Sequence, residues 1–379
     1  MSPPTLLRWL LCACAQKLAV APVSAPPHRT VGYPLGMSSS PTRLGLALGY
    51  WGAGPPEGVG EMVQEAERLG FHSLWTSEAY GSDAVAPLAW WGSQTKVMRL
   101  GTAVMQLHAR TPAATAMTAV TLDHLSEGRF ILGLGVSGPQ VVEGWHGVPF
   151  GRPLETTREY VEVVRQAIRR QGPLVYPGRR YQLPLPGTGG KPLRLTVHPR
   201  RERIPIWLGA EGPRNIALAA EVGDGWLAGF HAPSRSVWQA RALDEGFSHR
   251  AGGRPLDFEV AALLPIVPAP DVDSAADQVR PVLALYMGGM GSRDQNFHFN
   301  LFARMGFEGE ATRVRDLYLD GRRAEAVAAV PTRLVEAVAL VGPPAKLREE
   351  AAAWRGGLPS LLLVSGPPPL LRLAAELFR

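Results

Sequence analysis

The sequence predicts an α/β fold, a parallel (β/α)8 TIM barrel with insertions over its C-terminal face. Beyond residue 43, short apolar segments alternate with amphipathic ones, which is the pattern of a parallel sheet covered by helices. The apolar segments number eight, the strand number of this barrel. The chain of 379 residues has the length of one barrel domain, and its 46% hydrophobic and 19% charged residues are typical of globular proteins.

The predicted strands are apolar runs that end in glycine, proline or polar residues. They cover residues 44–49, 73–76, 100–105, 130–134, 204–208, 225–227, 258–266 and 358–364. Residues 59–69 illustrate the helices between them, because Val59, Met62 and Ala66 form one apolar stripe and Gly70 follows at the usual C-terminal position. The other predicted helices cover residues 84–95, 113–125, 155–170, 213–221, 275–287 and 344–354.

Two stretches interrupt this alternation, and we interpret both as insertions. Residues 172–203 are rich in proline and glycine, and residues 290–341 carry a second helical pattern. Insertions that follow barrel strands lie over the C-terminal face, where ligands bind, so both segments are candidate lids or pocket walls. A packing or dimer element is the alternative interpretation.

Residues 42–379 thus form the predicted barrel, and residues 1–41 form an N-terminal extension. The apolar run at residues 6–23 contains Arg8 and Lys17, which makes it a poor membrane span. No Lys or Arg precedes this run, although a signal peptide begins with such a charge. We therefore interpret the extension as disordered, or as an over-long start.

The cysteine count and the charge exclude several function classes. Cys12 and Cys14, the only two cysteines, lie in the extension, so the barrel has no thiol for disulfides, zinc or nucleophilic catalysis, which fits the cytoplasm. We take Met37, which three serines follow, as the true start. The formal net charge of +6 is modest, and the arginines of the chain are scattered, which argues against nucleic-acid or membrane binding. We expect a small-molecule substrate and no metal site.

A glycine-rich loop follows the fourth predicted strand. Glycine lets backbone N–H groups turn inward without Cβ clashes, and Ser137 adds a hydroxyl, so the loop is a candidate phosphate cradle. An ordinary tight strand exit is the alternative interpretation. The candidate residues are Gly135, Val136, Ser137, Gly138 and Gln140.

Polar side chains also follow the second and third predicted strands, where a barrel directs side chains into its mouth. His108 is a candidate proton carrier near neutral pH, and Gln106 is a candidate for holding a carbonyl or a ring edge. Glu78 is the second acid/base candidate, because a partly apolar pocket would raise its pKa, and the adjacent Ser77 is a candidate cofactor-binding residue. A solvated, capping or salt-bridged side chain is the alternative for each.

Three aromatic residues are candidates for the substrate pocket: Trp51, Tyr80 and Trp145. Trp51 and Trp145 each follow a predicted strand and lie next to a glycine, which favours a position at the barrel mouth. Packing within the barrel or helix layer is the alternative interpretation.

These segments resemble the luciferase-like monooxygenases and F420-dependent oxidoreductases. The run Leu-Asp-His-Leu-Ser-Glu-Gly-Arg-Phe at residues 122–130, followed by the glycine-rich loop, is a specific hallmark of the family. Residues 209–213 and 220–226 are similar to its later segment on the cofactor side. The resemblance extends from Thr42 to the C-terminus, and a homodimer is the usual assembly that it implies.

Residues 135–145 resemble the loops that seat the phosphate of the deazaflavin coenzyme F420. The resemblance implies that Gly209 and Ala210 also contact this cofactor. It further implies that Thr102, Ala103 and Val104 form a bulge behind the deazaflavin ring, with a non-prolyl cis peptide at Ala103–Val104. These assignments rest on the family pattern alone.

The implied activity is an F420-dependent oxidoreductase that transfers a hydride between deazaflavin C5 and a carbonyl, imine, activated alkene or secondary alcohol. Two alternatives stay open: an FMN-dependent luciferase-like monooxygenase, and a non-catalytic flavin-binding barrel. One departure argues against hexose-phosphate oxidation. The sugar-phosphate dehydrogenases of this family have an Asp-His pair after the second strand, where this chain has Ser77 and Glu78.

Overall fold

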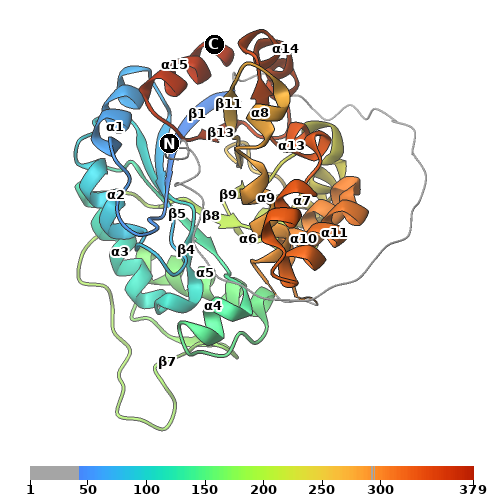
Figure 1. Ribbon diagram of the computed structural model, residues 1–379. Helices are drawn as coiled ribbons and strands as arrows, with labels where there is room; N and C mark the ends of the chain where they lie inside the picture. Colours follow the sequence, from blue (N-terminus) through green and yellow to red (C-terminus); the bar gives the residue numbers. More distant parts are fainter. Residues whose placement is uncertain (1–41, 292, 294) are drawn as a thin grey trace.

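The computed structural model describes residues 42–291, 293 and 295–379, and a parallel β-barrel forms its centre (Figure 1). Nine strands pair in the order β3-β2-β1-β13-β10-β9-β8-β5-β4, and β3 also pairs with β5, which closes the sheet. Because β3 and β4 both pair with β5, they are two parts of one barrel strand, and the barrel has eight. The strands are β1 (Arg43–Gly49), β2 (Ser73–Thr76), β3 (Arg99–Thr102), β4 (Met105–Gln106), β5 (Phe130–Gly135), β8 (Ile206–Gly209), β9 (Gly225–Ala228), β10 (Glu259–Leu263) and β13 (Leu361–Val364).

The predicted (β/α)8 barrel is therefore confirmed, and each predicted strand is present with small shifts of its ends. Residues 258–266 differ most, because the barrel strand β10 stops before Pro265, a residue without an N–H group for the sheet. The chain then forms β11 (Ile266–Pro268), which pairs with β12 (Leu340–Gly342) in a separate parallel pair. The predicted extension at residues 1–41 lies outside the described residues.

The helices that surround the barrel bury one apolar layer against it. They are α1 (Val59–Arg68), α2 (Val85–Gly92), α3 (Pro112–Leu125), α5 (Pro153–Arg169), α6 (Pro213–Val222), α7 (Val237–His249), α14 (Pro344–Trp354) and α15 (Pro368–Leu377). The sequence analysis missed α15 and α7. Helix α7 contains Gly246, which weakens its helical signal but lets it approach α6, because a Cβ there would lie 2.0 Å from the Ala217 carbonyl oxygen.

The helix predicted at residues 275–287 is not one helix and does not belong to the layer around the barrel. Pro281 divides it into α8 (Val272–Ala276) and α9 (Arg280–Gly288), and both belong to the insertion after β10. This insertion continues through α10 (Phe297–Phe302), a π-helical turn (Ala303–Phe307), α11 (Glu308–Leu319), α12 (Arg323–Ala328) and α13 (Thr332–Val338). It has an apolar core of its own. Its later helices are drawn in orange in Figure 1. Because it leaves the C-terminal end of a barrel strand, it lies at the predicted C-terminal face.

The insertion at residues 172–203 is placed differently from the prediction, because it follows helix α5 rather than a strand. It forms a short hairpin of β6 (Tyr176–Pro177) and β7 (Gln182–Leu183), followed by a long loop that extends from the barrel (Figure 1). Gln166 near the C-terminal end of α5 donates to the Val175 carbonyl, whereas Glu159 one to two turns earlier binds the hairpin tip. The hairpin tip therefore lies nearer the C-terminal rim than Val175 does.

Two tryptophans fill the barrel interior. Trp75 of β2 and Trp207 of β8 lie with ring centroids 5.2 Å apart. Glycines on neighbouring strands make room for them, since a Cβ at Gly101 would lie 2.3 Å from the Trp75 ring and one at Gly225 would lie 2.6 Å from the Trp207 ring. The interior is thus a packed core on which the barrel mouth rests.

A buried histidine lies where the barrel meets the insertion. His231 follows β9, is 2% exposed, and its Nδ1 is 2.8 Å from the Gln239 Oε1. Burial lowers the pKa of His231 to about 4, although the contact with Gln239 acts in the opposite direction.

Within the described part of the chain, no helix is both long and apolar enough to cross a membrane.

We predict that His231 makes the fold sensitive to acid. Because its pKa is lowered in the folded state, the unfolded chain binds a proton that the native chain does not, so stability is lost as the pH falls from about 6.5 towards about 4. Between pH 7 and pH 5 this loss amounts to about 2 kcal/mol. Urea unfolding at both pH values should give a smaller difference for His231→Gln than for the wild type, and equal differences would contradict the prediction.

Candidate active site

The third barrel strand is interrupted at the mouth of the barrel. The peptide bond Ala103–Val104 is cis, as predicted, and separates β3 from β4. The Ala103 N–H donates to the Thr76 carbonyl at 2.7 Å, and the Glu78 N–H donates to the Val104 carbonyl at 3.3 Å. Thr102 faces β5 instead of the mouth, because its hydroxyl donates to the Gly133 carbonyl and accepts the Gly133 N–H.

Val104 contacts two glycines that the sequence analysis assigned to the cofactor. A Cβ at Gly135 would lie 2.5 Å from Val104 Cγ2, and one at Gly209 would lie 2.8 Å from Val104 Cγ1. Ala103 and Val104 are partly exposed and pack on the tryptophan-containing core below. We call these four apolar residues, Ala103, Val104, Gly135 and Gly209, the floor; Gly135 is buried and the other three are partly exposed. Ala210 is buried beside it, with its carbonyl bound by the Trp226 indole N–H at 2.8 Å.

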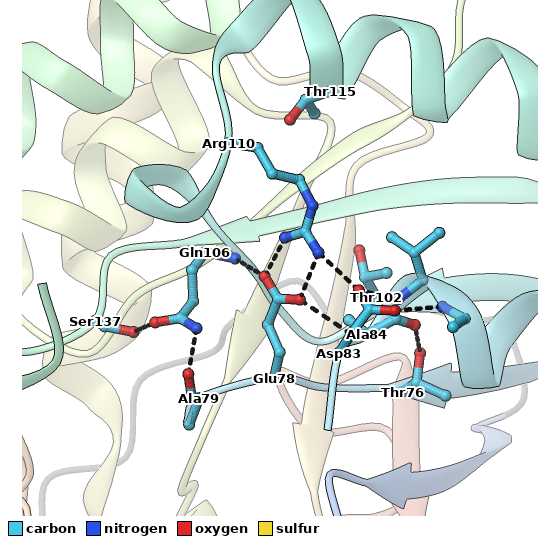
Figure 2. A network of polar contacts seen from close by, with 12 residues as sticks. Thr76, Glu78, Ala79, Asp83, Ala84, Thr102, Gln106, Arg110, Thr115 and Ser137 are labelled. Carbon is cyan, nitrogen blue, oxygen red and sulfur yellow. Dashed lines mark hydrogen bonds and ion pairs between the residues drawn. The ribbon is translucent and has the colours of Figure 1, made fainter. Parts of the chain in front are cut away.

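Gln106 and Ser137 meet beside this floor (Figure 2). The Ser137 hydroxyl donates to Gln106 Oε1 at 2.5 Å, and Gln106 Nε2 donates to the Ala79 carbonyl at 2.6 Å. The structure thus brings together two predicted cofactor residues from β4 and the loop after β5. Val136 and Gly138 are partly buried in this loop, whereas Gln140 is exposed on α4 (Pro139–Gly144).

Glu78 is not in the partly apolar pocket that the sequence analysis expected. Figure 2 shows its carboxylate paired with Arg110, whose Nη1 and Nη2 donate to it at 2.5 and 3.0 Å. The carboxylate also accepts the Gln106 N–H at 2.8 Å and the Ala84 N–H at 3.0 Å. Four donors and a side-chain exposure of 5% describe a buried, fully bonded carboxylate. The geometry therefore favours the salt-bridged alternative, and proton transfer by Glu78 stays an untested prediction.

His108 has the opposite environment. It lies in a 3-10 turn (Leu107–Ala109), and both ring nitrogens are buried without a hydrogen-bond partner among the described residues. Its ring stacks on Phe150 with centroids 6.2 Å apart. Burial lowers the pKa of His108, and the positive charges of Arg180 and His146 lower it further. The imidazole is thus neutral near pH 7 and free to bind a ligand.

The three aromatic candidates do not gather in one pocket. Trp145 is 66% exposed, so the structure does not enclose it. Trp51 is partly buried, and its backbone N–H donates to the Ser82 hydroxyl at 2.9 Å. Tyr80 is also partly buried; burial raises the pKa of Tyr286 of α9, and Tyr80 is one of the neighbours that raise it further. Ser77, partly buried beside the mouth, donates its N–H to the Gly49 carbonyl at 3.0 Å.

The sequence analysis missed an acidic residue at the mouth. Glu211 follows Gly209 and Ala210, and its Oε2 lies 2.6 Å from His298 Nδ1 of α10. Tyr286 meets the His298 ring edge-on, with centroids 4.6 Å apart. The position of Glu211 after a predicted strand was a usable signal, but the sequence alone could not show which residue of the 290–341 insertion lies beside it. Among residues 42–291, 293 and 295–379, no group of three His, Cys, Asp or Glu side chains is arranged to hold a metal.

We predict that Arg110 and Glu78 contribute to stability as a pair. Arg110→Met leaves the buried Glu78 carboxylate without its charge partner and should reduce the free energy of unfolding by about 3–5 kcal/mol. Asp83→Asn is the matched control, because Asp83 also binds Arg110 but is 40% exposed, and it should cost about 1 kcal/mol or less. Urea unfolding gives both values. A Glu78→Gln protein with wild-type stability and cofactor affinity but no turnover would instead support the acid/base role.

Comparison with known proteins identifies the family. The model of the luciferase-like monooxygenase family matches residues 37–360. A Mycobacterium tuberculosis (strain ATCC 25618 / H37Rv) protein named "Putative coenzyme F420-dependent oxidoreductase Rv3520c" is 48% identical over 341 residues, which are 88% of this chain and 98% of that protein.

Two solved structures share the fold. The coenzyme F420 dependent tetrahydromethanopterin reductase from Methanopyrus kandleri has a TM-score of 0.72 and 23% identity, covering 90% of this chain and 100% of its own. An F420-dependent secondary alcohol dehydrogenase, in complex with an F420-acetone adduct, has a TM-score of 0.69 and 19% identity, covering 89% of this chain and 98% of its own. With a family match over most of its length, the chain belongs to the luciferase-like monooxygenase family.

Proposed function

We propose that the chain is an F420-dependent oxidoreductase acting on a small organic substrate. The observation that carries the choice of cofactor is the 48% identity to a protein with this name across 98% of that protein's length. When bound, F420 would supply the chemistry, a hydride exchanged at deazaflavin C5 with a carbonyl, imine, activated alkene or secondary alcohol. The protein's task is to hold and orient the reactants.

The floor supports this proposal because its partly exposed residues Ala103 and Val104 offer an apolar surface to a deazaflavin ring. Ala103 and Val104 would lie behind the ring, and Gly135 and Gly209 would hold Val104 in place, since each leaves room for its side chain. Gln106 and Ser137 would bind a polar ring edge, since their hydrogen bond places both at the border of the floor. Glu78 would act as a positioning residue, because it binds the N–H of Gln106 and the guanidinium group that follows it.

Cofactor titration tests the proposal. The full chain is titrated with F420 and separately with FMN while intrinsic tryptophan fluorescence is followed, since Trp75 and Trp207 lie directly below the floor. Micromolar binding of F420 with weak binding of FMN supports the proposal. The reverse preference would indicate the FMN-dependent monooxygenase, and binding of neither would indicate a non-catalytic barrel.

The floor also yields a mutational prediction. Gly135→Ala would place a Cβ 2.5 Å from Val104 Cγ2, so Val104 must shift and the floor loses its shape. We expect F420 affinity to fall by about tenfold, or about 1.4 kcal/mol. Gly172→Ala is the matched control, because no atom lies within 4 Å of its added Cβ and Gly172 lies outside the 135–145 loop. Equal affinities of the two variants would contradict the assigned position of the ring.

We also propose that the protein is a homodimer that pairs through α2 and α3. Met117 and Leu125 are 58% and 72% exposed, and Trp90 near them is 68% exposed. A groove between the two helices has no charged lining residue: Val85, Ala89, Ala114, Met117, Thr118, Thr121, Leu122 and Leu125. Contiguous apolar surface of this kind is typical of an interface, and an uncharged patch can meet its own copy without repulsion.

The barrel sequence contains no cysteine, which supports a cytoplasmic location.

Charged substitutions test the dimer. Met117→Glu combined with Leu125→Glu should change the mass in light scattering from two chains to one, because two pairs of carboxylates would face each other across the symmetry axis. Leu256→Glu is the control, since Leu256 is fully exposed outside the groove. A wild type that is already monomeric, or a double variant that remains dimeric, would overturn this interface.

A further inference from the structure

Three basic side chains gather at the rim of the barrel mouth, and we call His108, His146 and Arg180 the rim cluster. His108 follows β4, His146 lies in the loop after α4, and Arg180 is at the tip of the β6–β7 hairpin. Both ring nitrogens of His108 and Nε2 of His146 are buried without a partner in the described part of the chain. Buried polar groups are nearly always hydrogen-bonded, so these three nitrogens are available to a bound group.

The position of Arg180 is built by a buried carboxylate. Glu159, 8% exposed, accepts the backbone N–H groups of Arg179, Arg180 and Tyr181 at 2.9, 2.8 and 3.0 Å. The hairpin tip is therefore fixed against α5 by three charge-assisted hydrogen bonds. Gly178 is required at this turn, because a Cβ there would lie 2.4 Å from Glu159 Oε2.

The guanidinium group of Arg180 then lies over a second glycine. A Cβ at Gly151 would be 2.6 Å from Arg180 Nη2, and Gly151 has a φ of 62°, in the left-handed region. Its neighbour Phe150 stacks on His108, so the same two-residue segment contacts both ends of the cluster. Phe297 of α10 covers the other side of Phe150, with centroids 6.3 Å apart. The insertion thus shields the cluster from part of the solvent.

Within the described residues, no acidic side chain forms an ion pair with the cluster. Glu159 accepts backbone N–H groups of the hairpin tip, and Glu143 accepts the Phe150 N–H at 3.1 Å. Arg180 forms no ion pair within the described residues, whereas its neighbour Arg179 lies 3.7 Å from Glu155. The charge of Arg180 is therefore available to a bound anion.

We propose that the rim cluster binds a phosphate or carboxylate group of the molecule that occupies the barrel mouth. A guanidinium fork and two imidazoles can together surround an oxyanion with charge-assisted hydrogen bonds. His108 is two residues beyond Gln106, so the anion lies at the rim next to the floor. For the identity of that molecule the inference rests on the proposed function, and two sources share the chemistry: an acidic substrate and the phosphate-bearing side chain of F420.

Inorganic phosphate is the probe for the site itself. Calorimetric titration of the full chain at constant ionic strength compares the wild type with Arg180→Gln and Arg179→Gln, which remove equal charge from adjacent residues. We expect Arg180→Gln and His108→Asn each to weaken phosphate binding by about tenfold or more, and Arg179→Gln by about twofold or less. Equal affinities in the wild type and Arg180→Gln, or equal losses in both arginine variants, would overturn the proposal. Urea unfolding of each variant verifies that the fold is intact.

A second titration distinguishes the two sources. F420 is compared with its deazaflavin nucleoside, which lacks the phosphate and the side chain beyond it. If Arg180→Gln weakens F420 but not the nucleoside, the cluster binds the cofactor; if neither changes while phosphate binding falls, it binds an acidic substrate. Either result supports the site. Phosphate binding that depends on Arg180 in a protein that does not bind F420 would retain the site and refute the proposed function.

Discussion

The Glu78 carboxylate is the centre on which the barrel mouth depends. It joins the end of β2 to the end of β4 through the Gln106 N–H, to the segment before α2 through the Ala84 N–H, and to the segment before α3 through Arg110. A carboxylate buried to this degree is stable only when its oxygens are fully bonded. The path of the chain on both sides of the Ala103–Val104 bulge is therefore tied to one side chain.

Close packing transmits this constraint to the neighbouring strands. Val104 occupies the space above Gly135 and Gly209, and Thr102 is hydrogen-bonded to Gly133 on both its donor and acceptor sides. Small residues at the ends of β5 and β8 are needed because larger ones would displace the bulge. The floor is thus held by close packing of Val104 on the neighbouring strands and by the hydrogen bonds of Thr102.

The strands were predictable because a barrel strand is buried on both sides and appears as an apolar run. The helix pattern was less reliable where packing overrides propensity, as in α7, whose interior Gly246 is required by the contact with α6. The roles of polar residues were least predictable. Asp123 belongs to the motif that indicated the family, yet it is a fully buried partner of Arg201 from the 172–203 insertion. The motif therefore specifies packing, and only partners distant in sequence could reveal this.

The two sides of the mouth differ in how their charges are compensated. Beside β8, Glu211 Oε2 lies 2.6 Å from His298 Nδ1, so an acid and a base are adjacent, although their geometry does not form a hydrogen bond. Beside β4, the rim cluster contains three basic groups, and its three buried imidazole nitrogens have no hydrogen-bond partner among the described residues. A ligand with an anionic end therefore gains most by directing that end to the β4 side, away from Glu211, which would orient it across the floor.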